Sequence, residues 1–173
     1  MRALLVIDML NDFVHPDGAL YVGGQVKETI QFSRGLIADS RGQNIPVIYI
    51  CDAHRQDDSE FSLFPAHCVR GTWGAQIYSE LSPAADDFLV EKRRFSAFFG
   101  TSLDIFLREK NITELAVVGV CTNICVLYTV CSARSLNYQV EVYRRGVTSF
   151  DLEAHDFALR EIQNTLGAQV VEQ

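Results

Sequence analysis

Two kinds of segment alternate along the whole chain. Short, nearly continuous apolar runs, typical of strands buried on both faces, occur at residues 3–7, 47–51, 88–90, 115–120, 139–143 and 168–171. Segments whose apolar positions recur at helical spacing occur at residues 25–41, 102–110, 123–136 and 152–165. This alternation predicts an α/β fold with a mostly parallel sheet of about six strands and helices on both faces.

Several chemically capable residues lie where the predicted strands end. Asp8, Asp52 and Lys92 lie at or just beyond such ends, and Cys125 lies in the first turn after another strand. Ligands of open α/β sheets bind beyond the carboxyl ends of the strands. The segment 53–76 has mixed polarity and no clear period, and a loop of that length in a small domain is usually functional. We therefore expect these residues and this loop to share one edge of the sheet.

Composition narrows the class of protein. The 173 residues suit a single domain, 1–173, and 48% hydrophobic with 21% charged residues is ordinary for a soluble globular chain. The net charge of −7, without a basic stripe, argues against a nucleic-acid partner. No GxGxxG motif follows any predicted strand, which argues against dinucleotide binding.

Membrane and disulfide signals are absent from the sequence. The early apolar run LLVI is too short for a membrane span or a signal-peptide core, so we expect a cytoplasmic protein with no membrane partner. The five cysteines are an odd number, and in a reducing compartment they are expected to be thiols. Cys51, Cys68 and Cys131 are interpreted as structural.

Cys125 is the candidate nucleophile, within GVCTNICVLYTV. A strand, a tight turn and a helix start would place its side chain at a helix N-terminus, where free backbone N–H groups favour a thiolate and can hold an oxyanion. Position alone does not separate this reading from an ordinary buried thiol, the common fate of a free cysteine. Cys121, which ends the strand, is expected to contribute its backbone.

A carboxylate and an ammonium would complete such a site. Asp8 could take the proton of the thiol and return it to a leaving amine, and Lys92 could supply positive charge to both groups. Taken singly, each has a plainer explanation, because Asp8 could brace a turn and Lys92 lies in the charged run EKRR. Their joint position at one edge favours the catalytic interpretation.

A second group of residues has the chemistry of a metal site. Asp52 and His54 are two apart in an extended segment and can bind one ion, and Glu60 and His67 follow in the loop. Two imidazoles with two carboxylates suit zinc, iron or manganese. The Asp-x-His pair alone is equally consistent with solvated loop side chains. His155 is expected to be exposed on a late helix.

Three blocks resemble one known family. LLVIDMLNDF, EKRRFSAFFGT and GVCTNICV are similar to the signature blocks of isochorismatase-like cysteine hydrolases, in order and over essentially the whole chain. The resemblance implies a three-layer Rossmann-like fold and a catalytic triad of Asp8, Lys92 and Cys125. It also implies a cis peptide at Val120–Cys121 that aims the Cys121 and Cys125 amides at an oxyanion. True isochorismatases lack the cysteine, so Cys125 indicates an amidase.

One branch of that family matches further. The segment DAH…E…LFPAHCVRGTWGAQI looks like the nicotinamidase (pyrazinamidase) branch. The resemblance implies one divalent metal ion, zinc before iron or manganese, on Asp52, His54, Glu60 and His67, with Glu60 the loosest match. It implies hydrolysis of nicotinamide to nicotinic acid and ammonia through a cysteine thioester.

The same resemblance suggests an aromatic substrate pocket and leaves other functions open. It indicates a flat ring stacked among Phe13, Phe64 and Phe95, with Trp73 a weaker match, although each phenylalanine could equally be core. One alternative is a metal-independent amidase or ureido hydrolase acting on another small amide. A second is a catalytically silent binding protein on this fold, against which the intact triad argues. Relatives are often dimers or larger, so the resemblance allows a homo-oligomer, but the sequence does not give the oligomeric state.

Overall fold

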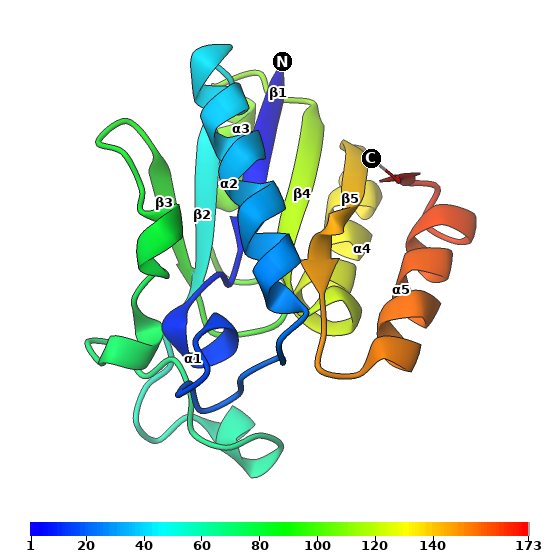
Figure 1. Ribbon diagram of the computed structural model, residues 1–173. Coiled ribbons are helices and arrows are strands. Elements are labelled where there is room, and N and C mark those ends of the chain that lie inside the picture. Colours follow the sequence, from blue (N-terminus) through cyan, green and yellow to red (C-terminus); the bar gives the residue numbers. More distant parts are fainter. Residues whose placement is uncertain (173) are drawn as a thin grey trace.

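A computed structural model describes residues 1–172 and contains one six-stranded sheet in the order β3-β2-β1-β4-β5-β6 (Figure 1). All five strand pairings are parallel. The strands are β1 (Arg2–Ile7), β2 (Val47–Asp52), β3 (Phe88–Lys92), β4 (Glu114–Val120), β5 (Gln139–Thr148) and β6 (Gln169–Val171). The α/β fold with a parallel sheet is thereby confirmed.

Helices cover both faces of the sheet, which gives three layers (Figure 1). Alternate residues of β1 point to opposite cores. Leu5 belongs to the core that includes residues of α3 (Leu103–Glu109), α4 (Leu127–Ser135) and α5 (Leu152–Asn164), whereas Leu4 belongs to the core that includes residues of α2 (Val26–Gly42). Residues 3–7 are at most 1% exposed, and each buried leucine or isoleucine contributes about 1.5–3 kcal/mol. The helices are α1 (Asn11–Val14), α2 (Val26–Gly42), α3 (Leu103–Glu109), α4 (Leu127–Ser135) and α5 (Leu152–Asn164).

The order of the strands places a crevice between β1 and β4. The chain builds outward from β1 to β2 and β3 on one side, and from β4 to β5 and β6 on the other. The point where this direction reverses is the topological switch point, where ligands bind in open α/β sheets. Asp8 immediately follows β1 at that point, and Cys125 follows β4.

Gly119 allows the ends of β1 and β4 to approach closely. It pairs with Ile7 in the ladder and has a φ of 128°. A Cβ atom at this position would lie 2.0 Å from the Ile7 carbonyl oxygen. Only glycine therefore fits here, both for its backbone conformation and for the space available.

Some local features differ from the sequence expectations. The short helix α1 was not apparent from the spacing, and β5 extends to Thr148 rather than ending at residue 143. The predicted helix 123–136 divides into a wide turn, Thr122–Val126, and α4. In that turn the Val126 N–H reaches back to the Cys121 carbonyl at 3.2 Å, one residue beyond the usual helical partner.

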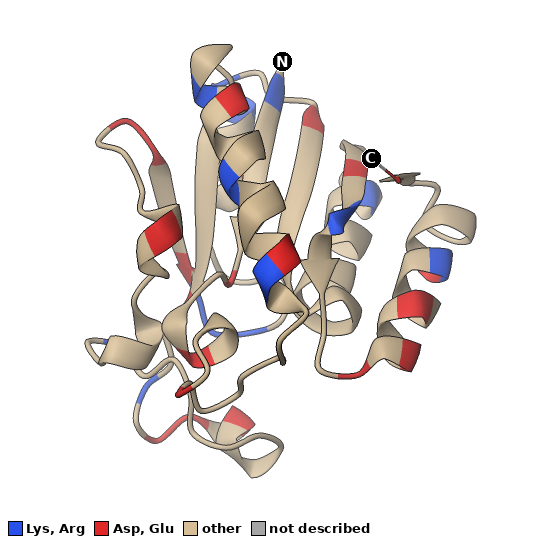
Figure 2. Cartoon of the chain, viewed as in Figure 1, with Lys and Arg blue, Asp and Glu red and all other residues tan. Residues whose placement is uncertain are grey.

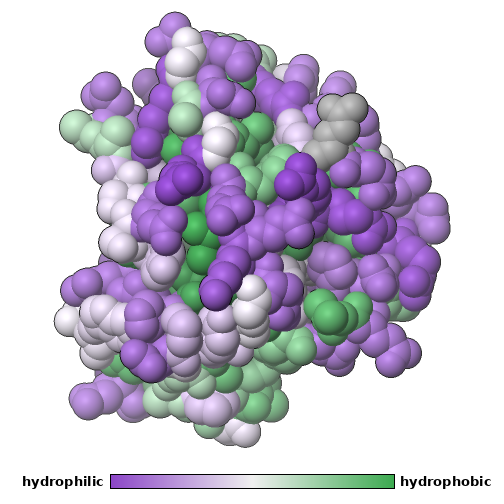
Figure 3. Space-filling model, in the orientation of Figure 1, coloured by the Kyte–Doolittle hydropathy of each residue, from purple (hydrophilic) through white to green (hydrophobic). Residues whose placement is uncertain are grey.

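The surface is polar and mixed in charge. Figure 2 shows basic and acidic residues intermingled on α2, and Figure 3 shows a face that is hydrophilic over α2 and α5, with apolar patches toward the loop end. Among residues 1–172, no helix combines the length and the apolar character that crossing a membrane requires.

Candidate active site

Four side chains from four strand ends meet in the buried crevice. Lys92 is the last residue of β3, and its Nζ lies 2.8 Å from Asp8 Oδ2, 2.6 Å from Asp52 Oδ1 and 3.3 Å from Cys125 Sγ. All four residues are buried. The expectation that they share one edge of the sheet therefore holds in the structure.

Lys92 carries the positive charge of this cluster. Although the run EKRR suggested a surface lysine as the plain alternative, the side chain is fully buried. Burial opposes its protonation, but the carboxylates of Asp52 and Asp8 outweigh that effect and hold the pKa of Lys92 well above its ordinary value. The ammonium donates hydrogen bonds to Asp52 Oδ1 and Cys125 Sγ and forms an ion pair with Asp8 Oδ2.

Asp8 is set up to exchange a proton near neutral pH. Burial, together with the neighbouring Asp52 carboxylate, raises the pKa of Asp8 to about 6, while Lys92 limits the rise. Its Oδ1 accepts the Asp52 N–H at 2.8 Å, which fixes the orientation of the carboxylate. A carboxyl with such a pKa can both accept and return a proton under ordinary conditions.

The charge state of Cys125 differs from the sequence expectation. Burial raises the pKa of this thiol well above its ordinary value, and Lys92 only partly opposes the effect. The helix N-terminus was expected to favour a thiolate, but desolvation of the sulfur outweighs it. The resting residue is therefore a thiol that needs a proton acceptor, and the Asp8 carboxylate, the Asp52 carboxylate and the sulfur lie within 4.8 Å of one another.

The turn that carries Cys125 also brings Cys121 to the crevice. The Val120–Cys121 peptide is cis, as the resemblance implies. Burial raises the pKa of the Cys121 thiol to about 12, and it is the Cys125 sulfur, not that of Cys121, that lies 3.3 Å from Lys92 Nζ. Cys131 is exposed on α4, because its position faces away from both cores, so its interpretation as a structural cysteine is wrong.

A second cluster lies on the other side of Asp52. His54 Nε2 is 3.6 Å from Asp52 Oδ2 and 3.8 Å from Glu60 Oε1, and His67 Nε2 is 3.9 Å from the same Asp52 oxygen. Ligand atoms around a tetrahedral zinc ion are separated by about 3.4 Å, because metal–ligand distances are near 2.1 Å. The four residues are all buried. Asp52, His54 and His67 offer ligand atoms that all lie within 4.8 Å of one another, which suits one divalent ion, and Glu60 approaches this group through His54.

Hydrogen bonding of the two histidines supports that fit. His67 Nδ1 lies 2.8 Å from the Pro65 carbonyl oxygen, so that nitrogen carries the proton and Nε2 offers its lone pair. Both ring nitrogens of His54 are buried and have no hydrogen-bond partner among the residues described. Of the two, Nε2 faces Asp52 and Glu60, an environment that suits a nitrogen ligand of a divalent cation.

Asp52 joins the two clusters. Its Oδ1 contacts Lys92, whereas its Oδ2 faces the two histidines. Through one oxygen, Asp52 belongs to the cluster of Asp8, Lys92 and Cys125. Through the other oxygen, it belongs to the cluster of His54, Glu60 and His67, here called the metal-side cluster.

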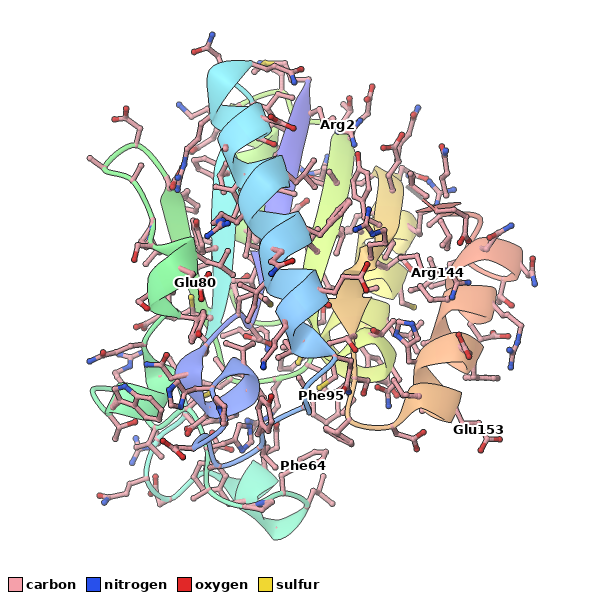
Figure 4. The ribbon with its side chains drawn as sticks, viewed as in Figure 1. Arg2, Phe64, Glu80, Phe95, Arg144 and Glu153 are labelled. Carbon is pink, nitrogen blue, oxygen red and sulfur yellow. The ribbon has the colours of Figure 1, made fainter. Side chains whose placement is uncertain are left out.

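An apolar pocket opens over both clusters. Its apolar lining consists of Phe13, Leu20, Phe64, Phe95, Ile124 and Phe150, and its remaining lining consists of Asp52, Glu60, His67, Cys121 and Cys125. Figure 4 shows Phe64 and Phe95 near the loop end of the molecule, and their ring centroids are 6.3 Å apart. Three of the four aromatic residues suggested by the sequence thus reach the pocket.

The remaining predictions need correction. Trp73 does not line the pocket; its side chain is 46% exposed and packs edge-on against His15. Phe150 was missed because the sequence places the end of this strand at residue 143, whereas β5 runs to Thr148 and Phe150 lies just beyond it. His155 is half-buried rather than exposed, because its Nδ1 lies 2.8 Å from the Thr122 hydroxyl in the turn before α4.

Comparisons with known proteins agree with this geometry. The isochorismatase domain model matches residues 2–173. The crystal structure of a nicotinamidase/pyrazinamidase from Bacillus subtilis is 38% identical, with a TM-score of 0.94 over 99% of both chains. The pyrazinamidase of Pyrococcus horikoshii, solved in complex with zinc, is 27% identical, with a TM-score of 0.93 over 99% of both chains.

One relative differs in its stated activity. An Arabidopsis thaliana protein named "Probable inactive nicotinamidase" is 32% identical over 94% of this chain and 88% of its own length. Family membership rests on the match over nearly the whole chain and on the agreement in fold. This chain is a member of the isochorismatase family, an amidohydrolase of the cysteine-nucleophile type.

Proposed function

We propose that the protein is a metal-dependent nicotinamidase that hydrolyses nicotinamide to nicotinic acid and ammonia. The observation that carries this proposal is that Cys125 and three residues of the metal-side cluster line the same aromatic pocket. Stacking against phenylalanines suits a flat heteroaromatic ring, and a ring bound there would have its carboxamide near the sulfur. The similarity to nicotinamidases and pyrazinamidases supports this substrate class.

The cofactor proposed is one divalent metal ion, zinc before iron or manganese. Asp52, His54, Glu60 and His67 would hold it, and the zinc complex of the Pyrococcus relative supports zinc. When bound, such an ion supplies a Lewis acid that can orient a ring nitrogen and lower the pKa of a coordinated water.

The reaction is then carried by the side chains of the crevice. Asp8 takes the proton of the Cys125 thiol, and the thiolate adds to the carboxamide carbon while the Cys121 and Cys125 amides hold the oxyanion. The C–N bond breaks as Asp8 returns its proton to the leaving nitrogen, and ammonia departs. Water adds to the thioester with its proton passing to Asp8, the C–S bond breaks as Asp8 returns that proton to the Cys125 sulfur, and nicotinic acid leaves. Lys92 holds both reacting groups in place throughout.

The charge of the pocket favours a neutral ring amide over a ureido acid. A ureido acid carries a carboxylate, which an enzyme binds with arginine or lysine. Neither residue type is among the lining residues, and the charged side chains that do line the pocket are Asp52 and Glu60. The metal-independent ureido hydrolase therefore remains the second candidate.

The first test is ammonia release by purified protein with its metal content determined. Release from nicotinamide that disappears in Cys125→Ala is expected, with pyrazinamide accepted and a ureido acid rejected. Substantial turnover by Cys125→Ala would overturn the nucleophile. Metal-replete protein that releases no ammonia from nicotinamide would overturn the substrate assignment, and normal turnover by chelated, metal-free protein would overturn the metal role alone.

A thiol probe separates this proposal from a silent binding protein. Cys131 is exposed, so the experiment begins from Cys131→Ser protein. A ring-bearing electrophile is expected to label Cys125 and to be slowed by nicotinamide. Absence of labelling at Cys125 would favour the silent alternative.

A further inference from the structure

Asp58 lies in the loop of the metal-side cluster, yet it is neither among the four proposed ligands nor in the pocket lining. We propose that Asp58 is a positioning residue that holds the proton of His54 on Nδ1, keeps Nε2 directed at the metal ion, and thereby sets the affinity of the site for that ion. This inference rests on the metal part of the proposed function. It concerns a residue that the sequence patterns did not single out.

The contact between the two side chains is short and buried. Asp58 Oδ2 lies 3.2 Å from His54 Nδ1, and neither side chain is more than 2% exposed. The pair is an ion-pair contact and not a hydrogen bond, since His54 Nδ1 has no hydrogen-bond partner among the residues described. A neutral imidazole carries one proton, and a carboxylate beside Nδ1 favours the form with that proton on Nδ1 and a lone pair on Nε2. The lone pair then faces Asp52 and Glu60.

Asp58 is itself held in place by two other groups. Its Oδ1 accepts the Glu60 N–H at 3.1 Å, where Asp58 caps the turn Ser59–Ser62, and accepts Arg94 Nη1 at 3.0 Å. The side chain therefore has little freedom to turn away from His54. The same bond to the Glu60 amide ties Asp58 to a second proposed ligand.

The two histidines differ in the group that holds Nδ1. His67 uses the neutral Pro65 carbonyl, whereas His54 uses a carboxylate. A carboxylate partner raises the basicity of an imidazole ligand more than a carbonyl does, and loss of such a partner weakens metal binding by about 10–100-fold. Asp58 is thus a charged residue outside the ligand set that contacts a proposed ligand, His54, and can change its affinity for the ion.

The test compares Asp58→Asn with Asp57→Asn. Asp57 is the neighbouring residue, but its side chain is 73% exposed and pairs with Arg55, so the same substitution there removes a charge without touching His54. Asparagine at 58 keeps the size of the side chain and an oxygen for the cap. Zinc affinity is measured by competition with a chromophoric chelator, alongside urea unfolding of the metal-free proteins.

We expect Asp58→Asn to weaken zinc binding by about 10–100-fold and Asp57→Asn to leave it within about twofold. The metal-free unfolding midpoints of all three proteins should coincide. Zinc affinity of Asp58→Asn equal to that of wild type would overturn this inference alone, as would an affinity loss matched by equal destabilisation of the metal-free protein. Wild-type protein that binds no zinc would overturn the metal role and this inference together.

Discussion

The two halves of the candidate site are built in different ways. The triad half takes Asp8, Lys92 and Cys125 from the ends of strands or the turn directly after one, where sheet hydrogen bonds fix the backbone. The metal half takes only Asp52 from a strand, and its other residues come from the loop after β2. The sheet thus fixes the positions of the triad residues, whereas the loop needs additional contacts to hold its metal-binding side chains in place.

That bracing is visible within the loop. His54 donates its N–H to the Cys68 carbonyl at 3.0 Å and accepts the Arg70 N–H at 3.0 Å, so the two histidine-bearing stretches run side by side. Cys68 in turn donates its N–H to Asp12 Oδ2 at 2.7 Å. Asp12 lies in α1 next to the pocket residue Phe13, which couples the metal half to the pocket wall.

The largest loss of stability is expected from Lys92→Met, which changes the triad half of the site. Removal of the ammonium leaves the buried carboxylates of Asp8 and Asp52 facing each other, which costs about 3–5 kcal/mol of unfolding free energy. Urea unfolding measures the loss, with the exposed Lys27→Met as the control. A change below 1 kcal/mol would mean that the triad half does not depend on the central cation.

Metal removal should lower the stability of the protein mainly through the metal half of the site. Zinc at about 100 times its dissociation constant is expected to stabilise the protein by about 2.7 kcal/mol, because the ion binds only the folded site. Thermal unfolding with zinc and with chelator measures this difference. His67→Asn should lose most of the stabilisation, whereas Cys125→Ala should keep it; equal loss in both would show that the halves are not separable.

An intermediate effect is expected from Gly74→Ala. A Cβ atom there would lie 2.0 Å from Asp12 Oδ2 and would displace the carboxylate that braces Cys68. We expect a loss of about 1–3 kcal/mol together with weaker zinc binding. Gly35→Ala, in an open position on α2, should instead stabilise by about 0.5–1 kcal/mol. Unchanged zinc affinity in Gly74→Ala would remove Asp12 from the bracing of the loop.

The smallest effect is expected from His155→Leu. The buried Thr122 hydroxyl then loses its partner in the turn that carries the nucleophile, at a cost of about 0.5–1.5 kcal/mol. The value of kcat should fall by less than about tenfold, with zinc affinity unchanged. His155→Asn, which can still bond the hydroxyl, should recover part of the loss, and kinetics with chelator titration measure both quantities.

The sequence predicted the strand-end residues because a single rule, that parallel strands end at one edge, places them without side-chain detail. The burial of Lys92 was harder to predict from the sequence. It depends on contacts with Asp8, Asp52 and Cys125, which come from other parts of the chain, and not on the run EKRR. The protonated state of Cys125 also follows from desolvation, which no local pattern records.

Loop residues were harder to predict because their neighbours come from the folding of the loop itself. Asp58 lies in the polar run QDDSE, which resembles a solvated surface, yet it is buried and accepts a hydrogen bond from Arg94, a residue distant in the sequence. Trp73 and Phe150 were misjudged for the same reason, since only the folded loop and the end of β5 decide which aromatic ring faces the pocket.

Gly119 takes no part in the reaction, but it limits the distance between the groups that do. Asp8, the proposed proton acceptor, directly follows Ile7, and the turn that carries the Cys125 sulfur begins three residues after Gly119. The absence of one methyl group at this ladder position therefore determines how far apart two groups from different strands can stand. Substitutions elsewhere in β1 and β4 can accumulate in the hydrophobic layers while that gap stays constant, so catalytic spacing and core composition can evolve independently.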